Sequence, residues 1–406
     1  MAFTSLLGKT TVYPGLQADC AFSTDPTSGS PSWTDITAYV RGFSCRRGRQ
    51  HDLSRIEAGT LDLLLSNNDR RFDPTYAAGP YYPNVLPLRR VRIRAQWSSV
   101  TYPLWAGYVE AWPPSWPAGG KDDVVTVHAA DAFKVLNLSS LRGASFASEL
   151  TSARVTNVLG TVSIPSADYS IATGEITLVA SGTIADDTTA LAHILEVVDS
   201  EGGGGLFYAS RGGTLIFEGQ RHRIANETVA SGTFVDGAGT TGLTYLDLQA
   251  SYDDSEVWNE VTMTPSGGTA ETVSDTGSQT TYFKRAVSFT GLHARQGEAA
   301  AVASIKLYRQ ADPVLRFPQM TVAGAANPSV LWPKLLALEL SDRIGVQRTP
   351  PGGGAAILQD CHVEGVEHTV GTDSWVTRLM LSKADAATSF WTLGTSQLGV
   401  DTTVGY

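Results

Sequence analysis

The stretch Arg90-Val-Arg-Ile-Arg-Ala-Gln-Trp97 shows most directly how the N-terminal part of this 406-residue chain folds. Its apolar residues Val91, Ile93 and Ala95 alternate with arginines and a glutamine, and a period of two predicts a strand with one buried face. Strands at this spacing predict a small β-barrel or sandwich over residues 1–145, with a short helix at 131–136. Comparable short stretches, separated by proline and glycine, lie at 33–40, 59–65 and 123–128.

Residues 146–245 change to a helical pattern. Apolar residues recur at helical spacing in 148–159 and again in 188–199, which predicts two amphipathic helices. A glycine run then ends the second helix, and residues 201–209 and 213–217 predict a β-hairpin. We therefore expect an α+β insert domain here.

Residues 246–406 return mainly to strands, which we expect to form a second β-barrel-like domain with a polar C-terminal tail at 394–406. One helix is expected at 298–308, and Arg316-Phe-Pro318 is expected to act as a breaker. The predicted fold class is mainly β with an α+β insert: two barrel-like domains plus smaller peripheral ones. Predicted strands lie at 257–263, 357–361, 363–366 and 375–381.

Composition narrows the functional classes. Hydrophobic residues make up 42% of the chain, which is enough for sizeable cores. Charged residues make up only 17%, and a surface this poor in charge suggests that partners cover much of it. The net charge of −10 argues against a general nucleic-acid-binding protein, although it permits a local basic patch.

The cysteines and the first residues indicate where the protein is made. Cys20, Cys45 and Cys361 are widely spaced and form no CxxC motif, so we expect reduced thiols and assembly inside a cell. The first ten residues lack the basic and apolar regions of a signal peptide. No run of about 18 apolar residues occurs, so we expect no membrane segment.

Motifs of the common enzyme classes are absent from the sequence. It holds no GxSxG, no HExxH, no Walker loop and no GxGxxG that opens a helix after a strand. The run Gly202–Gly205 lacks the Lys-Ser/Thr pair of a phosphate-binding loop, so it predicts a turn. We therefore expect no cofactor, no bound metal and no catalytic residue.

Two polar groups leave alternatives open. If residues 362–368 form a strand, His362, Glu364 and His368 share one face, which fits a metal site or, more simply, an exposed polar face. The segment 67–73 is rich in oxygen donors, but its two arginines would repel a calcium ion. A turn capped by Asn and Asp side chains fits that segment better.

Arginine is concentrated between residues 41 and 94, where eleven arginines and five acidic residues leave a local charge of +6. These arginines are either solvated or paired within the chain, or they form a contact surface, because guanidinium groups pair bidentately with carboxylates across interfaces. A nucleic-acid surface is the third alternative. Aromatic residues nearby fit interface anchors or ordinary core packing equally well. The candidate interface residues are Arg46, Arg47, Arg49, Arg70, Arg71, Arg89, Arg90, Arg92, Arg94, Trp105 and Trp112.

The order of several stretches resembles one family. The phrase Asn-x-Asp-x-x-Phe-Asp-Pro at 67–74, followed by Tyr-Tyr-Pro-Asn-Val at 81–85 and Arg-x-Val-Arg-type residues up to 94, resembles the N-terminal region of phage tail and minor tail proteins. Stretches at both ends of the chain resemble the tail hubs of long-tailed siphophage virions, which are related to baseplate hub proteins. These further stretches lie at 33–40, 103–109, 112–117, 251–262, 338–346, 363–368 and 375–381.

The resemblance implies a trimeric hub at the tail tip, with two barrel-like domains per chain, assembled in the host cytoplasm. Three chains would form a ring that adapts the tail tube to the three-fold tip and lines the DNA exit channel. The implied partners are two further copies, the distal tail or tail-tube protein, the tape-measure protein, and other minor tail or receptor-binding proteins. Contact with exiting DNA would be transient. Some relatives continue into peptidase or receptor-binding modules, and we expect no lytic activity in this chain.

Two alternatives remain open from sequence alone. A hexameric distal tail ring protein would have a similar N-terminal barrel. The second barrel-like half of this chain favours the hub instead. The second alternative belongs to a different functional class: a tail-tip protein that binds or degrades the cell wall. Asp253, Asp254 and Glu256 would be its first candidate carboxylates, although solvated loop acids are the simpler interpretation.

Overall fold

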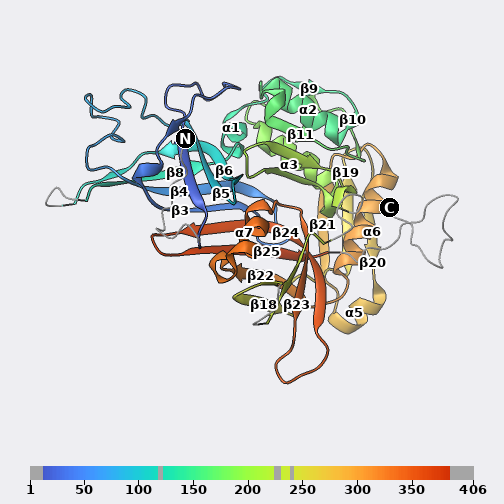
Figure 1. Ribbon diagram of the computed structural model, residues 1–406. Helices are drawn as coiled ribbons and strands as arrows, with labels where there is room; N and C mark the ends of the chain where they lie inside the picture. The colour runs from blue at the N-terminus through green and yellow to red at the C-terminus, as the bar shows by residue number, and fades with distance from the viewer. Residues whose placement is uncertain (1–11, 118–121, 224–229, 238–241, 385–406) are drawn as a thin grey trace.

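One large sheet organises the computed structural model, which describes residues 12–117, 122–223, 230–237 and 242–384 (Figure 1). Fifteen strands of these residues belong to this sheet, whose order is β17-β16-β23-β24-β3-β4-β8-β6-β5-β1-β2. Strands β25, β22 and β18 continue from the other edge of β24, and β7 adds to β8. The expectation of a mainly β fold with two barrel-like halves and an α+β insert is confirmed. The N-terminal segment and the tail at 394–406 lie outside the described residues.

The N-terminal half of the sheet confirms the strand pattern read at residues 90–97. Strand β5 spans Arg90–Trp97, and its residues alternate between buried and half-buried positions. The stretch 33–40, expected to be one strand, instead divides into β2, the short helix η1 and the first residue of β3. The elements are β1 Gly15–Cys20, β2 Thr34–Asp35, η1 Thr37–Tyr39, β3 Val40–Gly48, β4 Glu57–Ser66, β5, β6 Val100–Ala111, β7 Pro114–Ser115, β8 Val124–Ala130 and α1 Phe133–Leu138.

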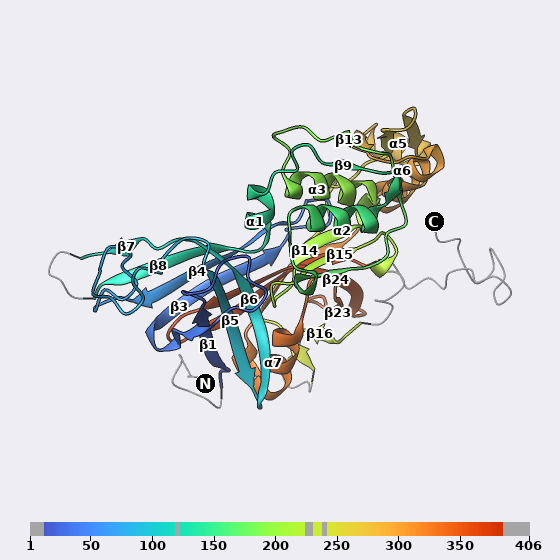
Figure 2. The same cartoon turned by 90° about the horizontal axis from the view of Figure 1, so that it is seen from above.

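The insert carries the two predicted helices and the predicted hairpin. Figure 2 shows α2 and α3 lying over the hairpin strands β14 and β15. Strand β11 adds to β15 in parallel, and short pairs β10–β12 and β9–β13 complete the unit. The elements are β9 Ser145–Phe146, β10 Glu149–Leu150, α2 Thr151–Thr161, η2 Ser166–Asp168, β11 Tyr169–Ile171, β12 Thr177–Leu178, β13 Gly182–Thr183, α3 Ala190–Ser200, η3 Gly202–Gly204, β14 Leu206–Ala209 and β15 Leu215–Glu218.

The C-terminal half of the sheet is built from two segments of the chain. Its first strands precede residue 252, and its remaining strands follow residue 315. The elements are β16 Thr233–Val235, β17 Leu243–Thr244, β18 Asp247–Ser251, β22 Arg316–Val322, η4 Gly324–Ala326, α7 Pro328–Ala337, β23 Arg343–Arg348, β24 Ile357–Val370 and β25 Trp375–Lys383.

The expectation that Arg316-Phe-Pro318 breaks the chain is wrong, because these residues begin strand β22. The register between β18 and β22 shifts between Gln249 and Ser251, opposite Phe317 and Pro318, and pairing of β22 with β25 begins only at Gln319. A proline has no N–H to donate, so a bulge is where a sheet accepts it.

The stretch 257–263 was predicted as a strand of the second barrel-like domain, and the structure places it outside the large sheet. It leads into β19, which forms a separate three-stranded sheet with β20 and β21. Helix α6 packs on this sheet and lies at the edge of the molecule beside the insert (Figure 1). Alternation predicts a strand but carries no information about the sheet it joins. The elements are β19 Glu260–Pro265, β20 Glu271–Ser274, α5 Thr276–Tyr282, β21 Ala286–Gly291 and α6 Gln296–Gln310.

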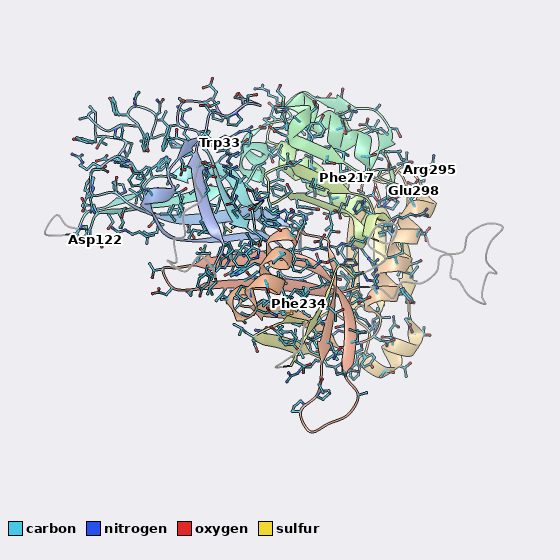
Figure 3. All side chains as sticks on the ribbon, in the orientation of Figure 1. Trp33, Asp122, Phe217, Phe234, Arg295 and Glu298 are labelled. Carbon is cyan, nitrogen blue, oxygen red and sulfur yellow. The ribbon has the colours of Figure 1, made fainter. Side chains whose placement is uncertain are left out.

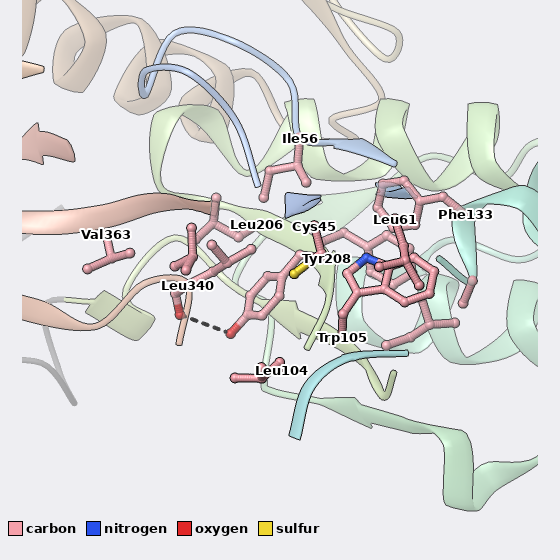
Figure 4. Close-up of a cluster of buried hydrophobic side chains, with 14 of the residues drawn as sticks. Cys45, Ile56, Leu61, Leu104, Trp105, Phe133, Leu206, Tyr208, Leu340 and Val363 are labelled. Carbon is pink, nitrogen blue, oxygen red and sulfur yellow. Dashed lines mark hydrogen bonds between the residues drawn. The ribbon is translucent and has the colours of Figure 1, made fainter. Parts of the chain in front are cut away.

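Each part of the molecule contributes large buried side chains. Figure 3 places Phe217 in the insert and Phe234 in the C-terminal half of the sheet, and both are fully buried. Figure 4 shows where the three parts meet: Leu61 and Trp105 from the N-terminal half pack near Tyr208 of the insert and Leu340 of the C-terminal half. The described cysteines are buried and free, which agrees with reduced thiols. No described helix is both long and apolar enough to cross a membrane.

Trp105 tests how much stability this shared core provides. Its side chain is 0% exposed, so Trp105→Ala removes a large buried ring from the meeting point of the three parts. We expect the free energy of unfolding, measured by urea denaturation, to fall by about 3–5 kcal/mol. Trp116→Ala serves as the control because Trp116 is 59% exposed. Equal losses for the two variants would contradict the assignment of Trp105 to the core.

Candidate interface and buried charge network

Strand β24 changes its partner partway along its length. Its N-terminal part pairs with β23 up to His362, and from Gly365 onward it pairs with β3 on the N-terminal half. The register shifts between Val363 and Gly365, which leaves Glu364 at the change of partner. Gly48 opposite has a φ of +93°, and a Cβ there would lie 2.1 Å from the Glu364 carbonyl oxygen. A side chain at Gly48 would therefore block the junction.

Glu364 is the charged centre of this junction and is only 2% exposed. Arg49 donates from Nε to its Oε2 at 2.7 Å, and Arg223 donates from Nη1 to its Oε1 at 2.6 Å. Burial alone would raise the pKa of Glu364, but the charges and hydrogen bonds of Arg223 and Arg49 outweigh it and hold the pKa well below its usual value. The carboxylate therefore stays ionised and ties three distant segments together.

Arg47 links the same three parts of the chain through a second, partly buried ion pair. It lies on β3, its guanidinium pairs with Glu339 after helix α7, and it donates to the carbonyl oxygen of Ala209 on β14 at 3.4 Å. Glu339 also accepts from the backbone N–H of Arg211 at 2.9 Å. Tyr208 adds a hydrogen bond from its hydroxyl to the carbonyl oxygen of Leu340 at 3.3 Å (Figure 4).

The arginines of β5 form a row on the polar face of the N-terminal half. Arg92 and Arg94 each donate to Oδ2 of the fully buried Asp19 on β1 at 2.9 Å. The β1–β5 register explains this, because Asp19 lies directly opposite Arg92. Arg92 also stacks over the ring of Trp33, and Arg90 pairs with Asp168 of the insert at 3.1 Å. All three arginine side chains remain partly exposed.

The other candidate arginines lie in loops or at the strand junction. Arg70 pairs with Asp73, Arg71 pairs with Asp69, and Arg89 donates to the carbonyl oxygen of Thr24 at 2.8 Å. Arg46 lies opposite Glu367 in the β3–β24 ladder, and its Nη2 is buried without a hydrogen-bond partner among the described residues. Internal pairing therefore accounts for most of the arginine-rich segment.

Both candidate tryptophans pack inside the chain. Trp105 is fully buried, and Trp112 stacks on Phe72 with ring centroids 6.0 Å apart. The indole N–H of Trp112 donates to the carbonyl oxygen of Leu86 at 2.9 Å. Of the two interpretations of these rings, the structure shows core packing within this chain.

The three polar residues of β24 do not lie on an exposed face, so that expectation is wrong. His362 and His368 are buried like Glu364. His362 contacts the Ser341 carbonyl oxygen at 3.1 Å through Nδ1, and His368 contacts Thr377 Oγ1 at 3.0 Å. Burial first, and neighbouring arginines second, lower the pKa of each imidazole to about 3.

The capped turn predicted at 67–73 is confirmed. The Asn67 side chain accepts from the Phe72 N–H at 2.9 Å, and Asp73 accepts from the Thr75 N–H at 2.8 Å. Gly202 has a φ of +70° in the short helix η3, which fits the turn predicted for the glycine run.

The loop acids after β18 are paired with two arginines. Asp253 and Glu256 both pair with Arg316, and Asp254 pairs with Arg285. Hydrogen bonds from Ser251 and Ser255 lower the pKa of Asp253. Burial raises the pKa of Glu256.

Sequence reasoning missed Asp19, Arg223 and Glu339, the partners that give the arginine-rich segment its structural role. Each is a single charged residue far from that segment, so no motif or spacing marks it. Asp19 alone carried a signal, since it interrupts the short apolar stretch that becomes β1.

Comparison with known proteins rests on structure alone, because no family model and no curated protein matches the chain. The fold is similar to a tail protein from Neisseria meningitidis MC58, with a TM-score of 0.59 and 12% identity, covering 92% of this chain and 96% of that one. It is similar to the 43 kDa tail protein of prophage MuSo2 from Shewanella oneidensis, with a TM-score of 0.56 and 12% identity over 92% and 97%. Prophage tail protein gp18 from Listeria monocytogenes EGD-e gives 0.50 and 9% over 90% and 94%. The chain thus has the fold of these tail proteins over nearly its whole length.

Glu364→Gln tests the charge network at the junction. The amide keeps the shape but removes the charge, which leaves Arg49 and Arg223 buried without their counter-ion. We expect the free energy of unfolding at neutral pH to fall by about 3–5 kcal/mol. Glu367→Gln on the same strand breaks only a partly exposed pair with Arg378 and should cost about 1 kcal/mol or less. A small loss in Glu364→Gln would rule out a structural role for the network.

The two buried histidines predict a loss of stability in mild acid. Each stays neutral in the folded chain, while the unfolded chain takes up a proton below the ordinary pKa of 6.5. Stability is therefore lost as the pH falls below that value, by about 2 kcal/mol per histidine at pH 5. Chemical denaturation between pH 7.5 and pH 5 should show a shallower decline for His368→Gln than for the wild type. An identical pH profile would mean that His368 is accessible to protons in the folded state.

Proposed function

We propose that this chain is a structural, non-enzymatic hub protein of a phage tail tip, which acts as a trimer at the distal end of the tail tube. The observation that carries the proposal is the similarity of fold to solved tail proteins over more than 90% of both chains in the first two comparisons. The continuous sheet supports it, because β24 joins the two barrel-like halves rigidly. A ring that must bear load during infection needs such a fixed geometry.

The polar face of β5 is the surface proposed to contact a neighbouring copy. Arg90, Arg92 and Arg94 are held in place by carboxylates of their own chain yet remain partly exposed, which fits a surface that contacts a partner. Exposed apolar side chains on the same half add contact area, namely Tyr82, Leu86 and Trp116.

The proposed hub contacts the distal tail or tail-tube protein, the tape-measure protein and other minor tail or receptor-binding proteins. The net charge of −10 supports a channel that does not retain DNA, because an acidic lumen repels the phosphate backbone. The acids at 253, 254 and 256 are all paired with Arg316 or Arg285, which supports the absence of glycosidase chemistry.

The mass of the purified protein, measured by light scattering at low and moderate salt, tests this proposal. We expect three times 43.2 kDa for the wild type. Arg94→Ser should weaken association by about tenfold or more while the fold survives, because Arg92 still pairs with Asp19. Arg142→Ser, which removes an exposed arginine of the insert, should remain trimeric.

Other masses favour other functions. A hexamer would support the distal tail ring protein instead of the hub. A monomer at both salt concentrations, together with release of fragments from peptidoglycan, would support the cell-wall protein and overturn the hub.

A further inference from the structure

Three metal-ligating side chains converge between two loops that are about two hundred residues apart in sequence. His51 and Asp52 lie in the loop between β3 and β4, and Glu256 lies in the segment between β18 and β19. Each offers one ligand atom, and these atoms lie within 4.8 Å of one another. Ligands at about 2.0–2.3 Å from one ion lie at most about 4.6 Å apart, so binding an ion would draw these side chains closer together.

The donor atoms are not used up by the protein itself. His51 Nε2 lies 2.9 Å from Ser54 Oγ, which orients the ring, while its Nδ1 is buried with no hydrogen-bond partner in the described chain. Asp52 makes no hydrogen bond or ion pair with any described residue. Arg316 donates from Nη1 to Oε2 of Glu256 at 2.7 Å, so Oε1 is the Glu256 oxygen that remains for a metal ion.

We propose that His51, Asp52 and Glu256 bind a divalent transition-metal ion of the zinc or manganese type. One imidazole and two carboxylates suit these ions better than calcium or magnesium, which prefer all-oxygen sites. Ser54 plays the supporting role, because a second-shell hydrogen bond to one imidazole nitrogen fixes the ring for coordination through the other. The site is independent of the trimeric hub function.

The basic side chains around the site have carboxylate partners. Arg49 and Arg223 pair with Glu364, and Arg316 pairs with Asp253 as well as with Glu256. Asp52 also acts electrostatically on Arg223 and Lys306.

The position of the site explains how an ion could reach it and which parts of the chain a bound ion would join. Asp52 lines a cavity of about 350 Å³, which gives an ion and its remaining water ligands a path from solvent. The walls of this cavity come from the β3–β4 loop, the insert, the segment before β19 and helix α6, which contribute Leu53, Phe207, Trp258 and Lys306 respectively. The ion would therefore clamp the N-terminal half of the sheet to the segment that leads into the β19–β21 unit.

Calorimetric titration of the untagged, chelator-treated full chain with Zn²⁺ and with Mn²⁺ tests the site. We expect one ion per chain and a higher melting temperature when it is bound. His51→Gln and Glu256→Gln should each weaken binding by about tenfold or more, and Glu256→Gln retains an acceptor for Arg316. The matched control is Asp254→Asn, which removes the neighbouring acid of the same loop, paired with Arg285, and should bind as the wild type does.

Circular dichroism separates loss of binding from loss of fold, since a folded variant keeps the wild-type spectrum without metal. Binding of Co²⁺ provides a second readout, because its visible spectrum should change in the wild type and in Asp254→Asn only. Failure of both Zn²⁺ and Mn²⁺ to bind, binding unaffected by His51→Gln and Glu256→Gln, or a preference for Ca²⁺ would each overturn the proposal.

Discussion

The buried carboxylate of Glu364 is the constraint on which the arrangement of the two sheet halves depends. It lies where β24 exchanges β23 for β3, and Arg49 and Arg223 hold it from two other segments. A buried charge is tolerated only when it is paired, so this junction has few alternative arrangements. The close approach at Gly48 restricts it further, because only glycine leaves room for the backbone of β24.

The arginine-rich segment combines a structural role with a proposed contact role. Its inner members, Arg47 and Arg49, are buried and join the N-terminal half to the C-terminal half and the insert through the carboxylates of Glu339 and Glu364. Its outer members on β5 are paired with Asp19 but stay partly exposed. Pre-ordered guanidinium groups lose less side-chain entropy on binding, which makes the same arrangement suitable for an interface. The proposed metal site lies a few residues beyond Arg49, so this loop connects both features.

The interior of the molecule belongs to all three parts together. Trp105, Tyr208 and Leu340 come from three different units and share one cluster (Figure 4). The segment 252–315 leaves the large sheet and packs beside the insert, so the C-terminal half of the sheet is built from strands on either side of that segment. Units joined in this way are expected to unfold as one, because each lacks part of its own core.

Much of the local structure was determined by the sequence itself. The alternation at residues 90–97, the helical spacing at 188–199 and the capped turn at 67–73 were all predicted correctly, because these patterns depend on neighbours a few residues away. The partners of Arg49 and Arg92, the sheet that β19 joins, the burial of His368 and the convergence of His51 with Glu256 were decided only by the tertiary structure. Those features depend on contacts between residues far apart in the chain. The sequence around a single carboxylate does not show which distant arginine will pair with it.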